Sequence, residues 1–209
     1  LQAVLDFFLL AGDDIYDDLI GTSVVRLYER LNHWLKSNWK FQARKNISYH
    51  YDLGNQFYRE WLDKTMTYSS ALFKNKKEVL STAQTNKYES ICKNLNLKEG
   101  DSVLEIGCGW GGFAEHAIKT RGVKLTGLTL SKEQLDYSKK RMFELGMADK
   151  SSFLLQDYRD EKGVYDGVVS IEMFEAVGEK YWPIYFKTIK NSLKGGGLGC
   201  LQVITIDDK

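Results

Sequence analysis

Residues 103–112 (VLEIGCGWGG) constrain the fold more than any other stretch, because an apolar run breaks there into four closely spaced glycines. The run is typical of a buried strand, and the glycines are typical of a tight turn. We expect a helix to follow over 112–120. Such a turn brings bare backbone N–H groups and a helix N-terminus against a nucleotide-like cofactor.

The glycines fit two cofactor patterns. Gly107, Gly109 and Gly112 satisfy the dinucleotide pattern, which also needs an acidic residue about 20 positions further on, at the end of the second strand. That strand is expected over 123–130, and it ends without a carboxylate. The turn therefore favours S-adenosylmethionine (SAM), whose E-x-G-x-G-x-G pattern is met by Glu105, Gly107, Gly109 and Gly111.

Strand-like and helix-like segments alternate from residue 100 onward. This alternation predicts an α/β fold, a parallel sheet with helices on both faces and a ligand at the carboxyl ends of the strands. We expect strands over 102–107, 123–130, 152–156, 165–171 and 198–206, and helices over 112–120, 132–146 and 179–193. Residues 1–98 are predicted to form an N-terminal helical segment, with a helix over 76–97, that covers the cofactor and substrate. Residues 99–209 form the predicted Rossmann-like domain.

Composition excludes some classes of function. The net charge of +1 gives no overall field that would recruit nucleic acid. The three cysteines are widely spaced and show no C-x-x-C pair, which argues against a zinc site or a disulfide framework. Residues 28–45 are basic and aromatic, so they predict either a helix on an anionic lipid surface or an ordinary amphipathic helix.

Polar residues at the ends of the expected strands are candidates for the cofactor site. Thr129 and Gln134 flank the second strand, where Gln134 either binds the ribose or closes a capping box on Ser131. Asp157 follows the third strand and either accepts from the adenine amino group or simply shapes a turn. Residues 170–178 (SIEMFEAVG) place two carboxylates, Glu172 and Glu175, among apolar side chains. If the segment is helical they share a face, which suits general base chemistry; the alternative is that one of them is simply solvated.

Six motifs together resemble the cyclopropane-fatty-acyl-phospholipid synthases. They occur in the same order as in that family, and the resemblance runs from about residue 48 to residue 206. The motifs are 50–55 (HYDLGN), 65–73 (TMTYSSALF), 104–112 (LEIGCGWGG), 127–131 (GLTLS), 155–160 (LQDYRD) and 169–178 (VSIEMFEAVG).

The resemblance implies a class I methyltransferase fold and a SAM-dependent C-methyltransferase that acts on the cis double bond of an unsaturated phospholipid. It implies that bicarbonate serves as the base, near Glu175, Ile171, Ser70 and Gln202. Ser70 stands where many members have Cys, and Gln202 where many have His. The resemblance assigns SAM to the turn at 104–112 and to Tyr68, Ser69, Thr129, Gln134, Asp157 and Tyr158.

The resulting hypothesis is a cytoplasmic enzyme, peripheral to the inner membrane, that makes cyclopropane fatty acids. We expect the last strands of the sheet to lie beyond Lys209, and the resemblance leaves a homodimer open. One alternative is a small-molecule N- or C-methyltransferase of the same fold. Another is a SAM- or lipid-binding module without catalysis.

Overall fold

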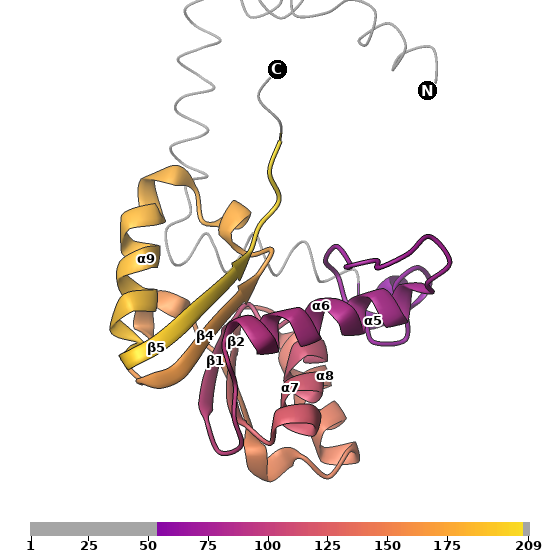
Figure 1. Ribbon diagram of the computed structural model, residues 1–209, viewed down its shortest axis with the longest axis horizontal. Coiled ribbons are helices and arrows are strands. Elements are labelled where there is room, and N and C mark those ends of the chain that lie inside the picture. Colours follow the sequence, from indigo (N-terminus) through magenta and orange to yellow (C-terminus); the bar gives the residue numbers. More distant parts are fainter. Residues whose placement is uncertain (1–53, 207–209) are drawn as a thin grey trace, which may run out of the picture. The chain divides into compact units, whose positions relative to one another are not determined.

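A five-stranded parallel sheet organises residues 54–206, which are the residues that this computed structural model describes (Figure 1). The spatial order is β3-β2-β1-β4-β5, and every neighbouring pair is parallel. The chain order therefore reverses between β1 and β4, where open α/β sheets bind ligands. The strands are β1 (Ser102–Ile106), β2 (Lys124–Thr129), β3 (Ser151–Leu155), β4 (Tyr165–Ile171) and β5 (Leu193–Gln202).

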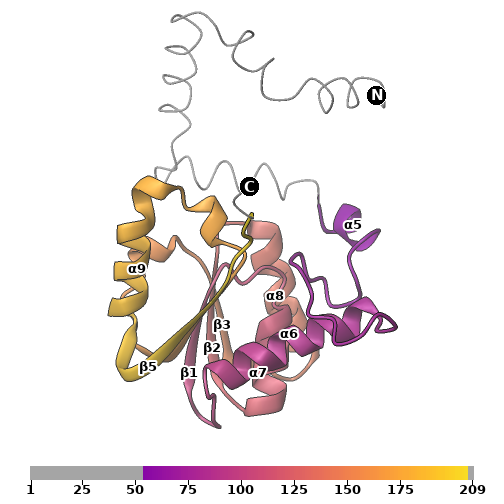
Figure 2. The same cartoon turned by 45° about the horizontal axis from the view of Figure 1, so that its top comes forward.

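Helices cover both faces of the sheet, which confirms the predicted fold class (Figure 2). One buried cluster joins the sheet to α6 (Leu80–Asn94), α7 (Gly112–Arg121) and α8 (Lys132–Glu144). A second cluster joins the opposite face to α9 (Trp182–Asn191). Shorter elements are α5 (Gly54–Arg59) and the 3-10 turns η1 (Ala148–Lys150), η2 (Tyr158–Asp160), η3 (Phe174–Ala176) and η4 (Glu179–Tyr181).

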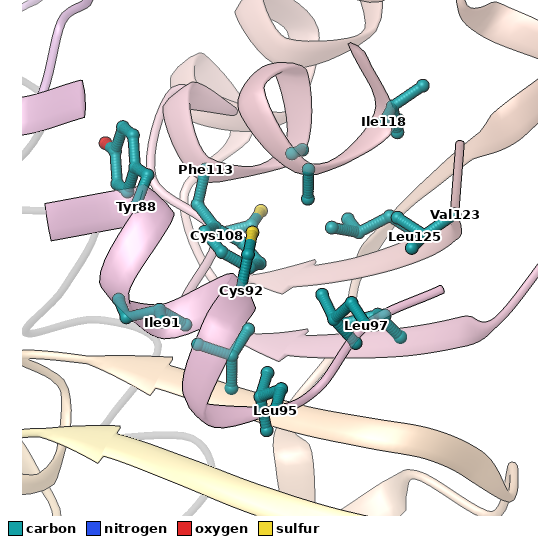
Figure 3. Packing of buried hydrophobic residues seen from close by; sticks show 14 of the residues in the cluster. Tyr88, Ile91, Cys92, Leu95, Leu97, Cys108, Phe113, Ile118, Val123 and Leu125 are labelled. Carbon is teal, nitrogen blue, oxygen red and sulfur yellow. The ribbon is translucent and has the colours of Figure 1, made fainter. Parts of the chain in front are cut away.

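The core on the α6 and α7 side explains why α6 packs against the sheet (Figure 3). Ile91 and Cys92 of α6 and Leu95 at its C-terminal end belong to the same buried cluster as Phe113 and Leu125, and all five are at most 5% exposed. The predicted division between residues 98 and 99 remains a prediction, but α6 shares one core with the sheet. The described residues, 54–206, all belong to one compact unit.

The end of the sheet differs from the prediction. β5 begins at Leu193 rather than at 198 and ends at Gln202 rather than at 206. Leu193 pairs with Tyr165, and the next partners are Leu198 and Gly167, with a register shift between them. Strand β5 therefore includes the glycines at 195–197, although a run of glycines is locally typical of a turn.

No helix within residues 54–206 is both long enough and apolar enough to cross a membrane. Two of the predicted features fall largely outside this range. The basic, aromatic stretch at 28–45 lies wholly before residue 54, and the motif at 50–55 is described only from Gly54.

Truncating a buried leucine of β1 should destabilise the fold. Leu104 is fully buried, and Leu154 on β3 is 37% exposed. We expect Leu104→Ala to lower the free energy of unfolding by about 2–5 kcal/mol, because it leaves a cavity. Leu154→Ala, the matched control, should lower it by less than about 1 kcal/mol. Urea denaturation measures both, and equal losses would contradict the assignment of Leu104 to the core.

Candidate active site

A cavity lies at the carboxyl edge of the sheet, where the predicted cofactor residues converge. Its walls come from the loops after β1, β2, β3 and β4 and from the segment before α6. The remaining candidates, Gly111, Asp157, Ser70 and Glu175, each adjoin a lining residue, and Gln202 reaches Ser70 through its side chain. The predicted residues that line the cavity are Tyr68, Ser69, Glu105, Gly107, Gly109, Thr129, Gln134, Tyr158 and Ile171.

The glycine turn adopts backbone angles that other residues rarely reach. Gly107, Gly109 and Gly111 have φ values of 82°, 51° and 80°. A Cβ atom added at Gly109 would meet no atom within 4 Å, so the backbone there borders open space. The N–H groups of Gly107 and Cys108 are held by the Leu128 carbonyl at 3.0 and 2.9 Å, which fixes the turn against β2.

Glu105 is the residue of this site that most clearly fits a cationic cofactor. Its side chain is 2% exposed, and within the described part of the chain its Oε2 atom has no hydrogen-bond partner. Burial raises the pKa of Glu105 well above its usual range, while the positive charges of Lys87 and Arg141 act in the opposite direction. SAM carries an ammonium and a sulfonium group, so it would supply positive charge beside this carboxyl.

The structure shows one half of the capping box expected at Gln134. The Ser131 hydroxyl accepts from the Gln134 backbone N–H at 3.3 Å and caps α8. The Gln134 side chain does not return to the Ser131 backbone, as a capping box would require. Instead, its Oε1 accepts from the Thr129 hydroxyl at 2.8 Å, and both residues line the cavity. The ribose contact stays a prediction that this placement allows.

Asp157 shapes a turn, which is the simpler of its two predicted roles. Its Oδ1 atom accepts from the Arg159 backbone N–H at 2.9 Å, and its Oδ2 atom pairs with the Arg159 guanidinium at 2.6 Å. The following residue, Tyr158, lines the cavity and packs edge-on against Tyr185. The adenine contact of Asp157 remains a prediction.

Lys87 is a site residue that the sequence analysis missed. It is 3% exposed on α6, and its Nζ donates to the Ser69 hydroxyl at 2.6 Å. Gln84, one turn earlier, donates to the Ser69 carbonyl at 2.8 Å. Burial lowers the pKa of Lys87 to about 8, and the nearby Glu172 carboxylate partly opposes that change. The sequence did contain a signal for this site: the polar residues Gln84 and Lys87 lie on the same face of α6 as Tyr88 and Ile91.

Three residues far apart in the sequence meet at one carboxylate oxygen. Glu172 Oε1 accepts from the Ser70 backbone N–H at 2.9 Å and from Gln202 Nε2 at 2.8 Å. It also accepts from the Ser70 hydroxyl. Ser70 and Gln202 are two of the four residues that the resemblance places near bicarbonate. With Glu172 in this position, their donors are taken, so they do not fit a separate anion.

Glu175 lies in a different environment from Glu172. Its Oε1 accepts from the Ile204 backbone N–H, just beyond the end of β5. Glu175 is in η3, whereas Glu172 has a φ of 48° in the turn after β4. The condition for a shared helical face is therefore not met, because the chain turns between the two residues.

The sheet order, the glycine turn after β1 and a cavity at the β1–β4 reversal define a class I SAM-dependent methyltransferase fold. Residues 39–209 match the mycolic acid cyclopropane synthetase family, and the chain belongs to that family. Among residues 54–206, no cluster of His, Cys, Asp or Glu has the arrangement of a metal site.

Several curated proteins and solved structures are similar to this chain. A probable fatty acid methyltransferase of Pseudomonas putida is 43% identical over 78% of this chain and 42% of its own length. The cyclopropane-fatty-acyl-phospholipid synthase of Escherichia coli K12 is 41% identical over 74% of this chain and 39% of its own length. Tuberculostearic acid and sphingolipid C9-methyltransferases are also relatives.

The mycolic acid cyclopropane synthase CmaA1, solved with SAH and CTAB, superposes with a TM-score of 0.73 at 32% identity. The match covers 76% of this chain and 55% of that one. The chain thus spans about two fifths of the length of the first two relatives.

Placing a side chain in the glycine turn should remove SAM binding. Gly109→Val puts a β-branched residue at a φ of 51°, with its side chain where the cofactor would approach. Gly146→Val is the matched control, because Gly146 has a φ of 66°, has open space around its Cβ position and does not line the cavity.

Isothermal titration should show SAM binding at least about tenfold weaker in Gly109→Val, which corresponds to 1.4 kcal/mol. Gly146→Val should lose stability but keep its affinity. Unchanged affinity in Gly109→Val would overturn the cofactor assignment.

Proposed function

We propose that the protein is a SAM-dependent C-methyltransferase that acts on the cis double bond of an unsaturated phospholipid acyl chain. The observation that carries this proposal is the buried Glu105 carboxyl at the glycine turn. Among the described residues its Oε2 atom has no hydrogen-bond partner, and a cationic cofactor would satisfy it. Membership of a lipid-modifying family supports the choice of a lipid acceptor.

The walls of the cavity suit this chemistry. An alkene is a weak nucleophile, so the methyl donor and the double bond must be held close together and in line. Attack leaves a carbocation, which water would trap, and the site must therefore exclude water. Much of the lining is apolar, with Met66, Ile106, Phe113, Leu128 and Met173 among the residues.

The product that we propose is a cyclopropane ring. The similarity to the E. coli phospholipid synthase favours ring closure, whereas the similarity to a fatty acid methyltransferase favours a methylated chain without a ring. Both outcomes begin with the same methyl transfer and need a base at the same place. The polar cluster around Ser70 lies beside the cavity and can serve either one.

We also propose that the enzyme works in the cytoplasm, peripheral to the inner membrane, because its acceptor is a membrane lipid. The predicted homodimer remains open. Bicarbonate, which the resemblance predicts as the base, has no step in this proposal, because Glu172 occupies the donors of Ser70 and Gln202.

The function can be tested with full-length protein, SAM and vesicles of unsaturated phospholipid. We expect each modified acyl chain to gain one CH₂ unit and to lose its double bond, with ring protons visible by NMR. A gain without ring protons would replace cyclopropanation with another lipid methylation. Vesicles of saturated phospholipid are the control, and no gain with unsaturated vesicles would contradict the lipid acceptor.

Glu175→Gln should lower turnover and leave SAM binding intact. The amide can still accept from the Ile204 N–H, but it removes a negative charge next to Ala176, which lines the cavity where the carbocation would develop. We expect turnover to fall about 100-fold, the usual effect of losing one stabilising group. Glu179→Gln, in the next turn and exposed, is the control. A parallel loss of SAM affinity would show that Glu175 is only structural.

A further inference from the structure

Glu172 holds a backbone conformation that is unfavourable for its residue type. Its φ of 48° lies in the left-handed region, which a glutamate rarely adopts. The backbone is fixed there because the Glu172 N–H donates to the Gln202 carbonyl at 2.8 Å. Strained positions of this kind cluster at functional sites.

In this backbone conformation the Glu172 side chain lies against three hydrogen-bond donors. The Ser70 N–H, the Ser70 hydroxyl and Gln202 Nε2 all converge on Glu172 Oε1. Such convergence is how proteins hold an anion, since charge-assisted hydrogen bonds are stronger than neutral ones. The contacts join the segment before α6 to the ends of β4 and β5.

The carboxylate is the group in this cluster that can accept a proton. The Ser70 hydroxyl and the Gln202 amide are not basic at neutral pH. The Gln202 amide also suits this place, because it donates a hydrogen bond to the carboxylate and does not take up a proton itself. A histidine at this position would compete with the carboxylate for the proton. Glu175 is held by the Ile204 N–H and is not among the lining residues, whereas Glu172 lines the cavity.

We propose that the Glu172 carboxylate is the base of the reaction and takes the place of bicarbonate. The inference rests on the proposed function. In methyl transfer, the electron pair of the double bond forms a bond to the methyl carbon, and the electrons of the broken C–S bond stay on sulfur. Glu172 then accepts a proton from the new methyl group. The electron pair of that C–H bond closes the ring, and the carboxylic acid later gives its proton to water.

Two variants separate the base from a merely structural side chain. Glu172→Gln keeps an oxygen that can accept from Ser70 and Gln202, but it cannot take the proton. Glu172→Gly relieves the left-handed backbone and exposes the same donors to an anion from solution. Glu144→Gln on α8, an exposed residue paired only with exposed Lys140 in the described part of the chain, is the matched control.

The assay uses full-length protein with SAM and unsaturated phospholipid vesicles in buffer depleted of carbon dioxide. Wild type and Glu144→Gln should turn over normally without added bicarbonate. Glu172→Gln should lose roughly 100-fold or more in kcat, the usual contribution of a general base, while its SAM affinity is unchanged. Added bicarbonate or formate should restore turnover to Glu172→Gly, which a structural role would not allow.

A binding measurement makes the result independent of turnover. By ¹³C NMR, labelled bicarbonate should bind Glu172→Gly and not wild type. Bicarbonate-dependent turnover in wild type, bicarbonate binding to wild type, or normal kcat in Glu172→Gln would each overturn the proposal. If wild type transfers no methyl group to lipid, the proposed function and the base role fail together. A binding difference would then still show that Glu172 fills the anion site.

Discussion

The register between β4 and β5 determines which side chains meet at the cavity. Ile171, the last residue of β4, is paired with Gln202, so the next N–H along the chain, that of Glu172, reaches the Gln202 carbonyl. The side chains of Glu172 and Gln202 thereby both contact the hydroxyl oxygen of Ser70, a residue 102 positions before Glu172. A slip of one residue would turn Gln202 to the opposite face of the sheet and separate the cluster. The chemistry at this edge thus depends on backbone pairing.

Strands β1 to β4 could be predicted to within one residue at each end, because each is an apolar run bounded by turn residues. The start of β5 could not be predicted. Gly195 and Gly196 favour a turn locally, but pairing with β4 resumes on both sides of the irregularity. Tertiary pairing overrides local preference here, as it commonly does in strands.

The sequence predicts those parts of the candidate site that depend only on the local backbone conformation. A turn that passes close to a cofactor needs positive φ, and glycine meets that need, so the turn from Gly107 to Gly111 could be found from its spacing. The hydrogen-bond partners of Glu172 could not be found from sequence spacing. Ser70 and Gln202 lie 102 and 30 positions from it, and no periodic pattern connects them. Lys87 was missed for a related reason, because a lysine on a helix is ordinarily a solvated residue.

The buried charge of Lys87 lowers the stability of the fold, and the same charge helps to position the site. The pKa of Lys87 is about 8 in the folded protein against 10.5 for an ordinary lysine, so the unfolded chain binds more protons between these values. Below about pH 8 both states are protonated, and the ammonium lowers the stability of the fold; this penalty shrinks as pH rises toward 10.5. The same ammonium holds the Ser69 hydroxyl, and the next N–H along the chain is the Ser70 donor to Glu172. A neutral apolar residue at position 87 would remove the penalty, but it would also release the segment that completes the anion site.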